Sequence, residues 1–200
     1  FARLQVFLKY ATIFFEVEPM VEKSCISTFY GHNFDPTQPT AEDICLEDIA
    51  HALSMLSRAN GHFREFYSVG RHSLNCAYEA KARGLSVKVQ LIALLHDSAE
   101  CYIGDLTRPL RRHIPEFTDY ERALQKLIFE KYAAFEITDE NRRAVREIDD
   151  SLLYHEFLVF HGAKLLESPP PLHIKLGSDK PHAETEGEFL EVYRRLHEAL

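Results

Sequence analysis

Four polar residues of the types that hold cations or move protons lie in one short stretch, HDSAECYIGD. His96 and Asp97 are adjacent, and Glu100 and Asp105 follow three and eight residues after Asp97. In a helix, neighbouring side chains differ by about 100° and residues three or four apart lie one turn along, so His96, Asp97 and Glu100 share one face. The preceding LIALL is apolar. We therefore expect this polar face to lie in the core.

A buried carboxylate is unfavourable unless a cation or a hydrogen-bonding partner accompanies it. His72 lies in the partly apolar stretch YSVGRHSLNCA. Asp149 and Asp150 lie inside REIDDSLLYHEF, where aspartate is a poor helix former. Two imidazoles and two carboxylates form a mixed ligand set that suits one divalent transition metal, namely Mn, Co, Fe, Ni or Zn. From the residues alone, a satisfied core histidine and solvent-facing aspartates remain the alternatives.

Charge favours a small phosphorylated partner over a nucleic acid. The net charge is −8, whereas proteins that bind nucleic acid through counterion release usually carry a basic face. A small phosphate ester needs only a few arginines, and Arg58 precedes His72 in the sequence. His62 follows the helix-stopping Gly61 and is a candidate phosphate contact, with a capping or surface role as the alternative.

The ordered pattern of His72, His96-Asp97 and a late helical aspartate resembles the signature of the HD-domain superfamily of metal-dependent phosphohydrolases. The stretch HDSAECYIGDLTRPLR closely resembles a segment of bacterial 5'-deoxynucleotidases in that superfamily. The stretch LEDIAHALSMLSRANGHFREFYSVGRHS is similar to small HD hydrolases of bacteria and phages. The resemblance covers about residues 28–160.

This resemblance implies roles for individual residues. The implied metal ligands are His72, His96, Asp97 and Asp149. Asp149 is preferred over Asp150 because family members place a glutamate seven positions after the ligand, and Glu156 keeps that spacing here. A single ion is expected because no extra histidine set of the binuclear type is present in the sequence.

The implied catalytic carboxylates are Glu100 and Asp105, and Arg58 would contact phosphate, although its spacing differs by one residue from the family pattern. The implied activity is hydrolysis of the phosphate ester of nucleoside or deoxynucleoside 5'-monophosphates. One alternative is a nucleotide triphosphohydrolase or pyrophosphohydrolase of the same superfamily. The other is a non-catalytic HD module that senses a nucleotide. A module of this kind usually lacks a metal ligand or a catalytic carboxylate. The resemblance also implies a homo-oligomer.

Apolar periodicity and turn signals predict an all-α fold, an HD-domain bundle of about five core helices plus a C-terminal helix. We expect loops at 31–40 and 105–115 and a non-helical SPPP segment at 168–171. The predicted helices cover about 42–59, 66–83, 86–102, 116–134, 139–160 and 184–200. Ser86 and Thr138 are the expected N-terminal caps of the third and fifth of these helices.

We assign residues 20–165 to the HD domain and 166–200 to a linker and a C-terminal helix that packs on it. Residues 1–19 are interpreted as an extension that precedes a natural start at Met20 or belongs to a longer chain. Their apolar run is interrupted by Arg3 and Lys9 and is too short to span a membrane. The four cysteines form no C-x-x-C pair, which fits reduced thiols in a cytoplasmic protein.

Overall fold

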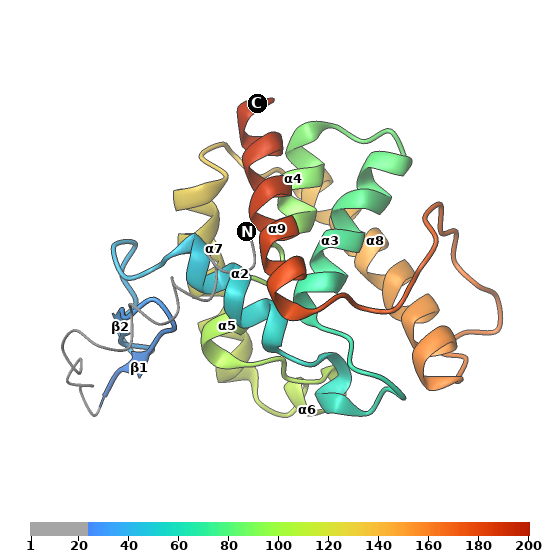
Figure 1. Cartoon of the computed structure of the whole chain (residues 1–200), viewed down its shortest axis with the longest axis horizontal. Coiled ribbons are helices and arrows are strands. Elements are labelled where there is room, and N and C mark those ends of the chain that lie inside the picture. Colours follow the sequence, from blue (N-terminus) through green and yellow to red (C-terminus); the bar gives the residue numbers. More distant parts are fainter. Residues whose placement is uncertain (1–23) are drawn as a thin grey trace, which may run out of the picture.

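Residues 24–200 are described by a computed structural model, and this part of the chain is an all-α bundle with one small hairpin (Figure 1). The predicted fold class is confirmed. The helices are α2 (Leu46–Met55), α3 (Val69–Ala82), α4 (Val87–Leu95), α5 (Glu100–Ile103), α6 (Arg108–Arg111), α7 (Pro115–Tyr132), α8 (Asp139–Glu156) and α9 (His182–Glu198), with a 3₁₀ turn η1 (Arg58–Gly61) and a π turn η2 (Phe157–His161).

Helix α3 lies at the centre of the bundle and packs against α2, α4, α8 and α9 (Figure 1). Its residues are buried along most of their length, from Val69 to Ala80. At Gly70 a Cβ atom would come within 3.1 Å of the backbone of Leu53 and Ser54. The absence of a side chain at this position therefore lets α3 approach α2 closely. Helix α3 carries His72, so this packing also positions the first candidate ligand.

Side-chain caps explain where the central helices begin. The hydroxyl groups of Ser68, Ser86 and Thr138 each accept a hydrogen bond from a backbone N–H of the first turn of α3, α4 and α8. Thr138 and Asn141 form a full capping box. The caps predicted at Ser86 and Thr138 are confirmed.

The first predicted helix is too long. Helix α2 covers only Leu46–Met55, because the chain then turns into an extended pairing. The N–H of Arg58 donates to the carbonyl of Tyr67, and the N–H of Val69 donates to the carbonyl of Leu56, both at 2.9 Å. These long-range bonds replace the helical ones that would continue α2.

The continuous helix predicted over 86–102 is also wrong. Helix α4 ends at Leu95, residues 96–99 form turns, and α5 begins at Glu100. Backbone N–H groups across this break donate to carbonyls three residues earlier, at 3.0 to 3.4 Å. Tighter winding of this kind aligns residues three apart. The winding brings Asp97 and Glu100 to one side, although the regular helix is interrupted.

Two predicted loops contain short elements. Strands β1 (Ile26–Ser27) and β2 (Asn33–Phe34) pair antiparallel, so part of the 31–40 segment is a hairpin. Asp48 holds the hairpin on α2 by accepting hydrogen bonds from the backbone N–H of Tyr30 at 2.9 Å and from Nδ1 of His32 at 2.7 Å. Helix α6 forms one turn within the predicted loop at 105–115. Within residues 24–200, no helix combines the length and hydrophobicity needed to cross a bilayer, and the apolar run at 1–15 lies outside the described residues.

The segment between η2 and α9 has no regular structure over 162–180 and is held by buried charges. Glu79 accepts hydrogen bonds from the backbone N–H and Nδ1 of His173, each at 2.8 Å. Arg71 lies 3.3 Å from Asp179 and 3.0 Å from Glu188. These ion pairs fix the segment and α9 against α3.

Replacing Glu188 with glutamine should lower the free energy of unfolding by about 1–3 kcal/mol at pH 7. Its carboxylate accepts hydrogen bonds from Arg71, Tyr78 and Lys180. Burial raises the pKa of Glu188, but these donors lower it to about 2 from an ordinary 4.5. The stabilisation should therefore be present above pH 4.5 and fade toward pH 2. Urea unfolding across this pH range tests the prediction, and substitution of the exposed Glu191 with glutamine is the control. A loss that does not change with pH would contradict the assignment.

Candidate metal centre

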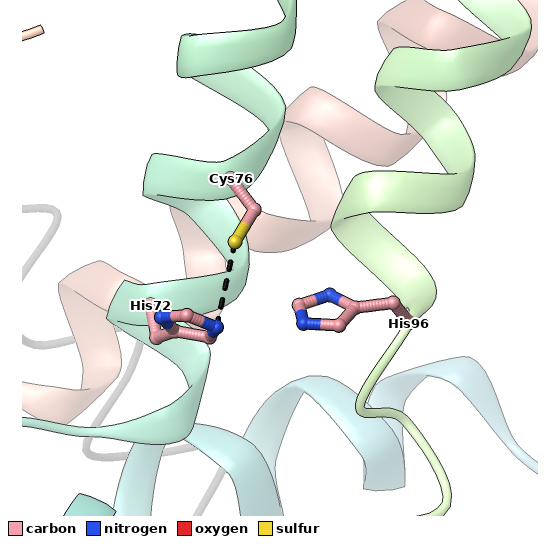
Figure 2. Close-up of side chains that lie close together, drawn as sticks. All are labelled: His72, Cys76 and His96. Atoms are coloured by element: carbon pink, nitrogen blue, oxygen red, sulfur yellow. Dashed lines mark hydrogen bonds between the residues drawn. The ribbon is translucent and has the colours of Figure 1, made fainter. Parts of the chain in front are cut away.

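The four predicted ligands come from three elements and lie together in the structure. His72 belongs to α3, His96 and Asp97 follow the end of α4, and Asp149 belongs to α8. Nε2 of His72 lies 3.3 Å from Oδ1 of Asp149 and 3.7 Å from Oδ2 of Asp97. Nε2 of His96 lies 3.2 Å from the same Asp97 oxygen. Figure 2 shows the rings of His72 and His96 turned toward each other, with centroids 5.3 Å apart.

The outer nitrogen of each imidazole is fixed by an acceptor. Nδ1 of His72 donates to Oε1 of Glu156 at 2.7 Å, and Nδ1 of His96 donates to the carbonyl of Ala93 at 2.8 Å. In the neutral ring this leaves the Nε2 lone pair free on the side that faces the other ligands. A carboxylate or carbonyl behind the ring is the arrangement that orients metal-binding histidines.

The residues present fit a divalent cation. Nε2 of His96 is buried and has no hydrogen-bond partner among residues 24–200, although Asp97 is near. The carboxylates of Asp97 and Asp149 are four-fifths buried, with side-chain exposures of 19% and 21%. Buried negative charge beside unpaired imidazole nitrogen suits a cation held by nitrogen and oxygen. These four side chains are therefore the residues that would hold such an ion.

The ligand carboxylates are ionised. Burial raises the pKa of Asp97, but the positive charge of His96 lowers it to about 2. Burial likewise raises the pKa of Asp149, and the neighbouring His72 lowers it well below its ordinary value. Burial and Arg58 lower the pKa of His72, but its neighbours Cys76, Glu156 and Asp149 raise it well above its ordinary value. Carboxylates that stabilise a proton on this imidazole also favour a metal cation there.

Arg58 is nine-tenths buried at the centre of this site. Its Nε donates to Oε2 of Glu156 at 3.0 Å, and its terminal nitrogens lie 3.5 Å from Asp97 and 3.8 Å from Asp149. After it, Ala59 and Asn60 have φ values of 52° and 50°, a left-handed conformation that asparagine tolerates but that is unfavourable for alanine. Strain of this kind often occurs at functional sites, and here it turns the chain just after the arginine.

Glu100 and Asp105 face the same cavity as the ligand aspartates. Burial raises the pKa of Glu100 well above its ordinary value, and the charges of Asp97 and Asp105 raise it further. Burial also raises the pKa of Asp105. Oε2 of Glu100 has no hydrogen-bond partner in the described part of the chain. These carboxyl groups can exchange protons with a molecule in the cavity.

The cavity has a volume of about 480 Å³, which is within the usual range for a small-molecule site. Its lining combines charged residues with apolar side chains, including Phe63, Leu153 and Phe157. His62 also borders the cavity and is exposed. At the rim, Arg108 donates hydrogen bonds to Asp150 at 2.7 Å and to Asp149 at 2.8 Å.

Several residues that shape the site were not assigned a role from sequence. Glu156 entered only as a spacing marker, yet it orients both His72 and Arg58. The sequence feature that could have indicated the role of Glu156 is its position two turns after Asp149, on the same face of the helix. Arg111 lies 2.8 Å from Glu121 and 3.6 Å from Glu100. Nothing in the local sequence links Arg111 to Glu121, because they belong to different helices.

No protein-family model matches the chain. The chain is 35% identical over 109 residues to the uncharacterized protein YfdR of Escherichia coli (strain K12), covering 54% of this chain and 58% of that protein. It is 40% identical over 89 residues to the uncharacterized protein RCAP_rcc00048 of Rhodobacter capsulatus, covering 42% and 45%. The chain thus spans about half the length of these curated relatives. Their names state no activity, so the resemblance to HD-domain enzymes stays a prediction.

The adjacent aspartates provide a matched pair for testing the ligand set. Asp149 faces His72, whereas Asp150 is half exposed and contacts Arg108 at the rim. Asp149→Asn should weaken binding of Mn²⁺ or Zn²⁺ by at least about tenfold, because a charged ligand is removed. Asp150→Asn should change the affinity little, since exposed ion pairs contribute about 0–1 kcal/mol. Calorimetric titration of the metal-free proteins measures the metal affinity of both variants. A larger loss of affinity in Asp150→Asn than in Asp149→Asn would exclude Asp149 as the ligand.

Proposed function

We propose that this protein is a metal-dependent phosphohydrolase of the HD type that cleaves the phosphate ester of nucleoside or deoxynucleoside 5'-monophosphates. One observation carries the proposal. The two imidazole Nε2 atoms meet the carboxylates of Asp97 and Asp149, and these carboxylates line a cavity that also contains two further carboxyl groups and a buried arginine. This combination supplies each group that hydrolysis of a phosphate ester requires.

Cleavage of a phosphomonoester requires neutralisation of phosphoryl charge, an in-line water and a proton for the leaving oxygen. When bound by these ligands, a divalent metal supplies positive charge at the phosphoryl group. Arg58 adds a fixed guanidinium beside the ligand carboxylates, and Arg108 and Arg111 line the same cavity. The phosphate would therefore lie between the ligand set and these arginines.

Glu100 and Asp105 would carry the protons. One of them orients or deprotonates the attacking water while the other protonates the leaving alkoxide. Burial raises the pKa of each carboxyl group, which favours a protonated carboxyl group that can donate to the leaving oxygen. Arg111 lies 3.6 Å from Glu100 and is itself held by Glu121 at 2.8 Å, which limits the movement of this side of the site.

A nucleoside monophosphate suits the mixed lining of the cavity. The charged residues would receive the phosphate, and the apolar side chains, including Phe63, Leu153 and Phe157, would contact the base or sugar. A volume of about 480 Å³ favours a small ester over a polymeric substrate. The net charge of −8 also disfavours a nucleic-acid substrate.

A phosphate-release screen tests the proposal. Metal-free protein is loaded with Mn²⁺ or Co²⁺ and incubated with nucleoside and deoxynucleoside mono-, di- and triphosphates. We expect one bound ion per chain and orthophosphate release from 5'-monophosphates, with little release from 3'-monophosphates. Release of pyrophosphate or triphosphate from nucleoside triphosphates would instead support the alternative enzyme class. Nucleotide binding without turnover would favour a sensing module.

Glu100→Ala and Asp105→Asn should each bind metal with nearly wild-type affinity but lose turnover by about 10²-fold or more. The reason is that both carboxyl groups line the cavity, whereas His72, His96, Asp97 and Asp149 remain unchanged. Turnover of the metal-loaded variants and calorimetric metal titration provide the two readouts. Glu147→Gln, on the exposed face of α8, is the control. Wild-type rates in both variants would remove these residues from the mechanism.

A further inference from the structure

Cys76 lies one helical turn after His72 on α3, with its thiol directed toward the His72 ring (Figure 2). Its side chain is fully buried, and Sγ lies 3.4 Å from Nε2 of His72. One ligand atom from each of His72, Cys76 and His96 lies within 4.8 Å of the others. A sulfur atom therefore adjoins the same nitrogen atom that faces Asp97 and Asp149.

We propose that Cys76 is a sulfur ligand of the metal centre, which makes the site a mixed nitrogen, oxygen and sulfur centre. The inference rests on the proposed function only in placing an ion between His72 and His96. A metal with nitrogen at about 2.0–2.1 Å and sulfur at about 2.3 Å holds these two atoms about 3–3.6 Å apart, for angles between 90° and tetrahedral. The observed separation of 3.4 Å lies in this range.

The surroundings of the imidazoles favour this role over simple packing. Each Nδ1 atom is already bonded to an oxygen acceptor, so only the Nε2 atoms face the thiol side. Nε2 of His96 is buried without a hydrogen-bond partner among the described residues. The thiol can satisfy at most one of these nitrogens by donating its proton, whereas one cation satisfies both nitrogens and the sulfur together.

A second group, His32, Cys45 and Asp48, has similar spacing but carries no such inference. Both oxygens of Asp48 already accept hydrogen bonds, from the backbone of Tyr30 and from His32. The thiol of Cys45 donates to Glu47 at 3.2 Å. All the oxygens of this group are therefore in use, and Cys45 provides a matched cysteine control.

A sulfur ligand changes both the chemistry of binding and the choice of metal. On binding, the S–H bond of Cys76 breaks, a sulfur–metal bond forms, and the proton passes to the buffer. Thiolate is a softer ligand than carboxylate, so it favours Zn²⁺, Fe²⁺ or Co²⁺ over Mn²⁺ and Mg²⁺. Selectivity for the softer metals should therefore depend on this one side chain.

Titration of the metal-free full chain with Co²⁺ alone tests the proposal. Wild-type protein should develop a near-ultraviolet sulfur-to-cobalt charge-transfer band together with visible cobalt bands. Cys76→Ala should lose the charge-transfer band and keep the visible bands, and Cys45→Ser should keep both. Zn²⁺ affinity should fall by at least about tenfold in Cys76→Ala, and by more than Mn²⁺ affinity does.

Cys76→Ser retains the side-chain size and serves as a second variant, with circular dichroism to verify folding. Loss of the band in both variants supports the proposal. A wild-type protein that binds Co²⁺ without the band, or binds no Co²⁺, overturns it, as does a band that persists in Cys76→Ala. The wild-type band without phosphate release would leave the sulfur ligand standing and remove the proposed function. Phosphate release without the band would remove the sulfur ligand and leave the proposed function standing.

Discussion

The site depends on the hydrogen bonds that the buried carboxylate of Glu156 accepts. This carboxylate is fully buried near the end of α8 and accepts hydrogen bonds from Nδ1 of His72 at 2.7 Å, Nε of Arg58 at 3.0 Å and the hydroxyl of Tyr67 at 3.0 Å. A charge in such surroundings is tolerated only when donors surround it. The donors come from α3, η1 and the segment before α3, so satisfying one carboxylate fixes three elements relative to α8.

The consequences reach both the proposed metal ligands and the cavity that Asp97 and Asp149 line. The bond to Glu156 directs the free nitrogen of His72 toward Asp97 and Asp149. The bond to the other oxygen of Glu156 holds Arg58 beside the same aspartates. Arg58 thus compensates negative charge that would otherwise be concentrated in the core, and it remains within reach of a ligand in the cavity. Ligand orientation and charge compensation have one common origin.

Local sequence signals predicted the elements well where the chain's own neighbours decide the structure. The caps at Ser86 and Thr138 and the helical character of α7, α8 and α9 follow from turn residues and periodicity. Prediction failed where contacts between residues far apart in the chain override these local signals. Helix α2 is shortened because residues 56–58 pair with 67–69. Periodicity contains no information about such pairings.

The sequence by itself determined the residue types, their order and the two helices that carry His72 and Asp149, because these depend on short-range spacing and caps. Only the tertiary structure decided that Asp149 rather than Asp150 faces His72, and that Cys76 directs its sulfur to the same nitrogen. The partners in the site are far apart in the chain, with 84 residues separating His72 from Glu156. Their meeting depends on how α3 and α8 pack, which follows from burial of the whole core and not from any one stretch of sequence.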